Sequence, residues 1–302
     1  MFGLGSAVAS EVASAATEVA SLPVKAGKAV FSEVEAFKHI NALTELSSKP
    51  VDDSQLVDHH HLPPTLQYVY KESQIIKETA EKELVDVEID LFPVKSGDSD
   101  QKTVVLRILP KDASEAKEQA VLLFAHDTSS VAVMLELSRV ASQSTAGFKH
   151  DGVIFFFNAG DEDPGHMFTQ HKWNDTVRVA IDLDSVFSEG KKPSVFQWGG
   201  PHSSAIGNSA SEAKYPSGQI LAQDIFSTGV IQSTTTTDFQ VYKEDAGLSG
   251  LDFAFGDNNA VYHTKNEKPG PLKPGTVQHL GENLLAFLLQ VAGSNDKLPS
   301  QY

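Results

Sequence analysis

The clearest alternation of apolar and acidic residues along the chain begins at residue 85. Apolar residues take every second position there, namely Val85, Val87, Ile89 and Leu91, and acidic residues lie between them. Side chains of a strand point alternately to its two faces, so this pattern predicts a half-buried strand. The segment Thr103–Leu109 is expected to pair with it across a turn at Ser96–Asp98.

Two later segments, Val121–Ala125 and Val153–Phe157, are apolar without interruption. Continuous apolar runs of this length are typical of parallel strands that are covered on both faces. We therefore expect two adjacent central strands. Further strands are predicted at Val177–Leu183, Val195–Trp198 and Leu251–Phe255.

Helices are predicted where apolar residues recur every three or four positions. One carries Val34, Phe37, Ile40, Leu43 and Leu46, and others are expected at Pro64–Lys82, Val131–Gln143, Ser203–Ala213, Gly218–Ser227 and Thr276–Val291. Buried strands that alternate with helices indicate the α/β class. We expect a three-layer fold in which a mixed, mainly parallel sheet lies between helices.

The expected domain boundaries follow the ends of this alternation. Residues 31–292 are predicted to form one α/β domain, with an N-terminal extension at 1–30 and a tail at 293–302. Within the extension, one stripe of a helix is formed by Val8, Val12, Ala15, Val19 and Leu22. Two alternatives stay open for that helix: it lies on its own domain, or it docks to another protein chain.

Charge and composition narrow the classes of partner. The 302 residues include 40 acidic and 24 basic side chains, and the net charge of −16 disfavours nucleic acid and anionic membrane surfaces. No segment approaches the roughly 20 apolar residues of a membrane span, so we expect a soluble chain without a transmembrane segment. Glu11 and Glu18 interrupt the apolar stretch that a cleaved secretory signal needs. Cysteine is absent, so a metal site must use His, Asp and Glu.

Candidate metal ligands follow four of the predicted strands. Binding sites of open parallel sheets form at the carboxyl ends of the strands. Those ends carry His126 and Asp127, Asp161–Asp163, Asp182 with Asp184, and His263. Imidazole and carboxylate groups together suit zinc or another divalent ion. The four ends together indicate a metal site, and a chance set of solvated turns is the alternative.

Several longer segments resemble the peptidase domain of plant endoplasmic reticulum metallopeptidases. They are Lys214–Phe226, Thr237–Glu244, Gly247–Phe255 and Val261–Asn266, and the similarity extends from about Phe31 to Ala292. These enzymes belong to the broad family of zinc aminopeptidases, which also contains the glutaminyl cyclases. The resemblance implies a zinc-exopeptidase-like fold.

The resemblance also implies roles for five residues. Four would be metal ligands: His126 as the first metal-binding histidine, Asp184 on the first metal, Glu162 on the second metal, and His263 as the last histidine. Asp161 falls where the family has its general-base glutamate. In such sites two cations polarise the scissile carbonyl and activate a water, whose proton a carboxylate accepts.

This sequence departs from the family pattern at the presumed metal centre. Relatives have a longer loop after the first histidine, and that loop carries the aspartate that bridges both metals. Here the sequence passes from His126–Thr128 straight to a helix expected to begin near Ser130, so the loop and its bridging aspartate are missing. Asp161 is one methylene shorter than the glutamate it replaces, which sets it back from the water.

Two hypotheses follow for the function. The first is a non-catalytic structural or protein-interaction subunit with a degraded dinuclear site, which holds no cofactor and binds a partner through the N-terminal helix. The second is an active zinc-dependent exopeptidase of the aminopeptidase type, with an altered, mononuclear site. Location in the endoplasmic reticulum is implied by the resemblance alone.

Overall fold

The computed structural model describes the chain in ten stretches. They are residues 30–47, 62–96, 99–125, 127–143, 151–158, 164–183, 193–198, 219–222, 249–255 and 275–293. Within these stretches, the larger of two hydrophobic clusters contains residues from Phe31 to Ala292. The boundaries expected at 30/31 and 292/293 stay a prediction.

The described strands form one mixed sheet in the order β1-β2-β4-β3-β5-β8-β6-β7. Their bounds are β1 Val85–Ser96, β2 Ser99–Pro110, β3 Ala120–Ala125, β4 Gly152–Phe157, β5 Val177–Leu183, β6 Pro193–Trp198, β7 Gln219–Ala222 and β8 Ser249–Phe255. The central block β4-β3-β5-β8 is parallel. The antiparallel hairpin β1-β2 joins it on one side and β6 on the other. The predicted mixed, mainly parallel sheet is therefore confirmed.

The two apolar runs are adjacent parallel strands in the middle of the sheet, as predicted. Ala120 of β3 lies beside Gly152 of β4, and Ala125 lies beside Phe157. Every residue of both strands is buried. Helices on both faces explain why neither strand alternates between apolar and polar residues.

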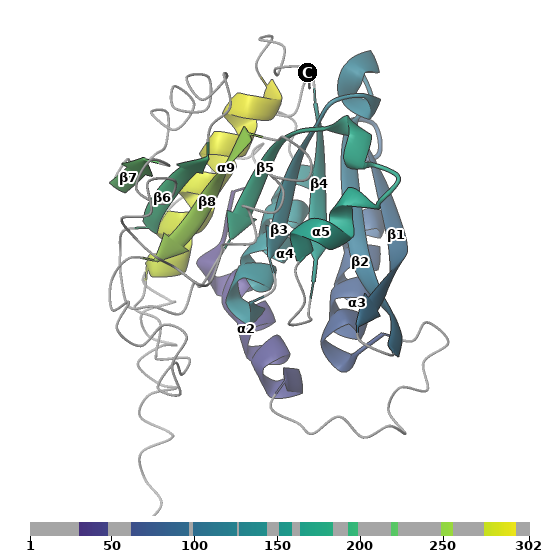
Figure 1. The fold of residues 1–302 in the computed structure, drawn as a ribbon, viewed down its shortest axis with the longest axis vertical. Coiled ribbons are helices and arrows are strands. Elements are labelled where there is room, and N and C mark those ends of the chain that lie inside the picture. Colours follow the sequence, from purple (N-terminus) through teal and green to yellow (C-terminus); the bar gives the residue numbers. More distant parts are fainter. Residues whose placement is uncertain are drawn as a thin grey trace, which may run out of the picture.

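In the described part of the chain, four helices cover one face of this sheet. They are α2 Glu33–Ser47, α3 Pro64–Thr79, α4 Thr128–Gln143 and α9 Thr276–Gly293. Their apolar side chains share a core with one set of strand residues, including Val121, Leu123 and Phe155. Figure 1 looks onto the sheet from the opposite side, so α2, α3 and α4 lie behind the strands.

The short helix α5 Pro164–Thr169 lies on the opposite face, in front of β4 in Figure 1. Its Phe168 packs with the other set of strand residues, including Leu122, Phe124 and Phe156. Alternate residues of the same strands thus feed two separate cores, which confirms the three-layer arrangement.

One predicted helix is wrong. Residues 219–222 fall within the helix expected at Gly218–Ser227, but they form strand β7, which pairs in parallel with β6. A short apolar run fits either element, and pairing with a neighbouring strand decides between them.

The predicted face of α2 needs a correction. Val34 was expected to point inward, but it is 40% exposed. The buried positions are Ala36, Ile40 and Leu43, so a small alanine lies at the contact with the neighbouring helices. The helix predicted at Ser203–Ala213, the N-terminal stripe and the tail from 294 lie outside the described residues.

The N-terminal end of α2 is held against α9 by a close ring contact. Phe31 is 2% exposed. A Cβ atom added to Gly281 would lie 2.2 Å from the Phe31 ring. Only a residue without a side chain allows the ring to sit on the surface of α9.

We therefore expect Gly281→Ala to lower the free energy of unfolding by about 1–3 kcal/mol, because the added methyl overpacks this contact. Urea unfolding measures the change. In a Phe31→Ala background the same substitution should become neutral or stabilising, since alanine is the better helix former. An equal cost in both backgrounds would contradict the proposed contact.

Candidate functional site

The parallel strands β3, β4 and β5 end level with one another. Ala125 at the end of β3 pairs with Phe157 at the end of β4, and Phe124 pairs with Asp182, one residue before the end of β5. The Asn158 N–H also donates to the Ala125 carbonyl at 3.1 Å, so β4 continues beside the last residue of β3. Chain segments leaving these strands start from one edge of the sheet.

All five candidate site residues lie outside the described residues. Four of them follow the ends of these strands in the sequence: His126 directly follows Ala125, Asp184 directly follows Leu183, and Asp161 and Glu162 come shortly after Asn158. His263 lies between Phe255 and Gly275. Within the described stretches, no three His, Asp or Glu side chains are grouped to hold a metal ion. Convergence of the four candidate ligands, His126, Glu162, Asp184 and His263, at one end of the sheet stays a prediction, as does the general-base position of Asp161.

The connection from β3 to α4 is two residues long. Helix α4 begins at Thr128, earlier than the start expected near Ser130. The Asp127 carbonyl accepts the Val131 N–H at 2.8 Å, which makes Asp127 the N-cap residue. Aspartate is a preferred N-cap residue, and this was the signal for the earlier start. No longer loop separates His126 from the helix.

The segment that follows Asp161 and Glu162 is anchored by a buried histidine that the sequence did not reveal. His171 is 3% exposed, and its ring stacks on Phe168 of α5 with centroids 5.1 Å apart. Its Nδ1 accepts the backbone N–H of Trp173 at 3.1 Å. Its Nε2 is 3.0 Å from an Asp90 carboxylate oxygen on β1. Because Nδ1 accepts, Nε2 carries the proton and donates to Asp90.

Burial favours the neutral form of His171. Burial lowers the pKa of His171, although the Asp90 carboxylate opposes this effect. Burial alone would raise the pKa of Asp90, but hydrogen bonds from Lys172 and His171 outweigh it and lower that pKa. Both ring nitrogens have partners within the fold, so the Asp90–His171 pair ties α5 to the β1-β2 hairpin and is not a catalytic dyad.

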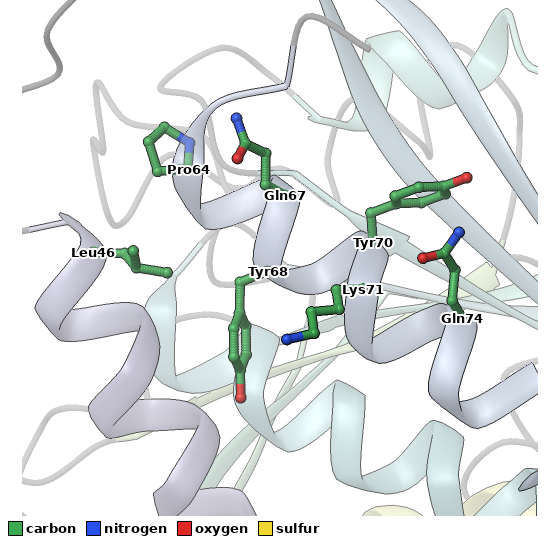
Figure 2. A pocket seen from close by; sticks show the side chains of 7 residues that line it. All are labelled: Leu46, Pro64, Gln67, Tyr68, Tyr70, Lys71 and Gln74. Atoms are coloured by element: carbon green, nitrogen blue, oxygen red, sulfur yellow. The ribbon is translucent and has the colours of Figure 1, made fainter. Parts of the chain in front are cut away.

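A pocket lies between the end of α2 and the start of α3 (Figure 2). It holds about 510 Å³ and is lined by Leu46, Pro64, Gln67, Tyr68, Tyr70, Lys71 and Gln74. The Tyr68 hydroxyl is 2.8 Å from Nδ1 of His39. Among the described residues that line this pocket there is no carboxylate or imidazole, so they offer no metal ligands of the kinds that zinc prefers.

The sequence of this chain matches a known family of peptidases. Residues 105–288 match the family model described as Peptidase family M28, which is more than half of the chain. The chain belongs to peptidase family M28. The matched stretch contains β3, β4 and β5 and all five candidate site residues. None of the helices in the described part is long and apolar enough to cross a membrane.

Curated members of the M28 family share substantial sequence with this chain. Endoplasmic reticulum metallopeptidase 1 of Mus musculus is 34% identical over 208 residues, which cover 64% of this chain and 22% of the mouse protein. The Vacuolar membrane protease of Schizosaccharomyces pombe is 26% identical over 277 residues, which cover 84% of this chain and 31% of that protein. The chain therefore spans less than a third of the length of these relatives.

Solved structures with M28-like folds confirm the expected architecture. The LapA aminopeptidase of Legionella pneumophila superposes with a TM-score of 0.64 at 16% identity, covering 95% of this chain and 73% of that one. A glutaminyl cyclase of Porphyromonas gingivalis gives 0.56 at 15% identity, covering 85% and 98%. At such low identity the likeness shows the fold alone. The zinc-exopeptidase-like fold is thus confirmed.

The His171 anchor predicts a pH dependence of stability. Unfolded His171 titrates near pH 6.5, whereas its pKa in the folded chain is lower. Below about pH 6.5 the unfolded chain therefore binds more protons, and stability falls with decreasing pH, by at most about 1.4 kcal/mol per pH unit. We expect the stability advantage of the natural chain over His171→Gln to shrink between pH 7.5 and pH 5.

Urea unfolding of both chains at each pH measures this advantage. Taking the difference cancels contributions from other histidines, such as His39, whose pKa is lowered to about 4 by burial. The positive charges of Lys172 and Arg107 lie near His171 and also lower its pKa. A stability difference that stays constant from pH 7.5 to pH 5 would rule out a neutral, buried His171.

Proposed function

We propose that this chain is a non-catalytic member of the M28 family, which serves as a structural or protein-interaction subunit and lacks a working dinuclear metal centre. The observation that carries the proposal is the two-residue connection between Ala125 and Thr128. Relatives are expected to place the metal-bridging aspartate on a longer loop at this point. A shared anionic ligand holds both cations of such a site at once, so its loss affects both metals.

Asp127 is a poor substitute for the missing bridge. Its backbone is committed to the start of α4, where its carbonyl accepts the first helical hydrogen bond. It also neighbours His126 directly, and adjacent side chains of an extended segment point to opposite sides. Thr128 and the following serines are neutral, and zinc prefers imidazole and carboxylate ligands.

Asp161 adds a second defect to the proposed site. A general base must lie within hydrogen-bond reach of the water it deprotonates, and aspartate falls one methylene short of glutamate. A misplacement near 1 Å can by itself cost about a hundredfold in rate. The lost bridge and Asp161 both concern the edge where β3, β4 and β5 end, while β3 and β4 themselves are fully buried.

The second candidate function is a zinc-dependent exopeptidase of the aminopeptidase type with a mononuclear site. The level ends of β3, β4 and β5 favour it, because they start the ligand-bearing segments from one edge. His126, Glu162, Asp184 and His263 form a donor set that suits one zinc ion, and Asp161 would accept the proton of a water. The ion would polarise the substrate carbonyl and lower the pKa of that water.

The proposed partner site is the N-terminal region. Val30, which precedes α2, and Val34 in its first turn are 51% and 40% exposed, and both follow the predicted stripe of residues 8–22 in the sequence. Exposed apolar side chains at this junction support docking to another protein, whereas the net charge of −16 disfavours nucleic acid. We also propose that the protein is located in the endoplasmic reticulum, because relatives such as endoplasmic reticulum metallopeptidase 1 are named for that compartment.

We expect the purified chain to contain less than one zinc per chain and to show no turnover of aminoacyl substrates, even with added zinc. Elemental analysis and a chromogenic aminopeptidase assay measure both quantities. Asp161→Glu alone should not restore activity, because it leaves the bridging ligand absent. Zinc-dependent turnover that is lost in His263→Ala, with unchanged stability, would instead establish the mononuclear exopeptidase.

A further inference from the structure

Four consecutive residues, Val30–Glu33, tie the start of α2 to the start of α9, and we name them the N-terminal clamp. The Glu33 N–H donates to the Gln278 side-chain carbonyl at 2.8 Å, and the Gln278 amide donates to the Phe31 carbonyl at 2.9 Å. Both carboxylate oxygens of Glu33 accept the Gly275 N–H at 2.9 Å. The start of α2 therefore donates a hydrogen bond to α9, and the start of α9 donates hydrogen bonds to Phe31 and Glu33.

The clamp also holds α4. The Ser32 N–H donates to the carboxylate of Glu136 at 2.9 Å, and Glu136 is completely buried. Arg139 pairs with that carboxylate at 2.7 Å and donates to the Val30 carbonyl at 3.3 Å. Removing the clamp would leave a buried carboxylate without one of its donors, which is a costly arrangement.

Glu33 supplies a cap that α9 lacks locally. The first N–H groups of a helix have no partner within it, and a side chain just before the helix commonly binds them. Gly275 precedes α9 with a φ of 89°, and glycine has no side chain for this purpose. Burial raises the pKa of Glu33, while the bonds from Gly275 and Gln278 lower it.

Helices α4 and α9 both begin at the edge of the sheet where β3, β4 and β5 end, which we call the candidate edge. Helix α4 starts after a two-residue connection from β3. Helix α9 ends at the opposite edge, where the Ala292 carbonyl accepts the Asp151 N–H ahead of β4. Its 18 residues span about 27 Å, so its start lies toward the ends of the parallel strands (Figure 1). The stretch that carries His263 enters α9 at Gly275.

We infer that the N-terminal clamp is a conformational coupling device: attachment of Val30–Glu33 and order in the first turn of α9 rise and fall together. A partner that prefers the attached form stabilises that turn, and one that prefers the released form frays it. The inference rests on the proposed function in placing a partner on the segment before Val30. It provides a path from that segment to the candidate edge.

Hydrogen–deuterium exchange of the full chain tests the coupling. Glu33→Ala removes the cap, so exchange at residues 276–282 should rise about fivefold. Glu35→Ala is the matched control, because Glu35 lies in the same helical turn but pairs with exposed Lys38 at 2.7 Å. It should change exchange at 276–282 less than twofold. Equal effects of both variants would overturn the inference.

A substitution in α9 tests whether the coupling also acts on α2. Gln278→Ala acts from α9, so coupling requires faster exchange at residues 33–37 of α2, with exchange in β3 unchanged. Acceleration confined to α9, or acceleration of β3 by the same factor, would overturn the coupling. Zinc content and peptidase turnover play no part in these rates, so the coupling and the proposed function can fail separately.

Discussion

The arrangement of the sheet and of its connecting segments depends on one constraint, which is the burial of β3, β4 and β5 on both faces. Their backbone groups bind one another, so the strands stay in register and the chain can turn only beyond their ends. Parallel strands also need crossover connections, which return over the faces as helices such as α4. Segments that leave the carboxyl ends are consequently gathered at one edge, whatever chemistry their residues perform.

The sequence predicts the parts of the fold that depend on local pattern. Val153–Phe157 is recognisable because burial on both faces removes every polar position from the strand. Residues 219–222 are not, because the choice between helix and strand depends on the neighbour β6. Val34 fits a helical stripe by spacing, yet the side that packs is decided by the clamp and by the helices beneath α2.

The sequence predicts which strand each candidate site residue follows, but it does not predict the distances between these residues. His126 and Asp184 follow their strands directly, so the edge on which they lie is set once the strands are parallel. The distances between them depend on segments whose paths no local pattern specifies. The same holds for Glu33 and His171, whose partners Gly275 and Asp90 are remote in sequence. Each resembles an ordinary helix or loop residue until the fold is known.

The direct passage from β3 into α4 has an evolutionary consequence. Point substitutions change side chains but leave the chain length between Ala125 and Thr128 unaltered. A loop carrying another carboxylate would need inserted residues, or would have to unwind a first turn whose Ser129 and Ser130 are fully buried. Under the proposed function, loss of this loop is therefore difficult to reverse, and selection no longer opposes drift at the remaining ligand positions. In lineages with the short connection, the sequence is expected to diverge fastest at the candidate edge, while the sequence of the strands changes slowly.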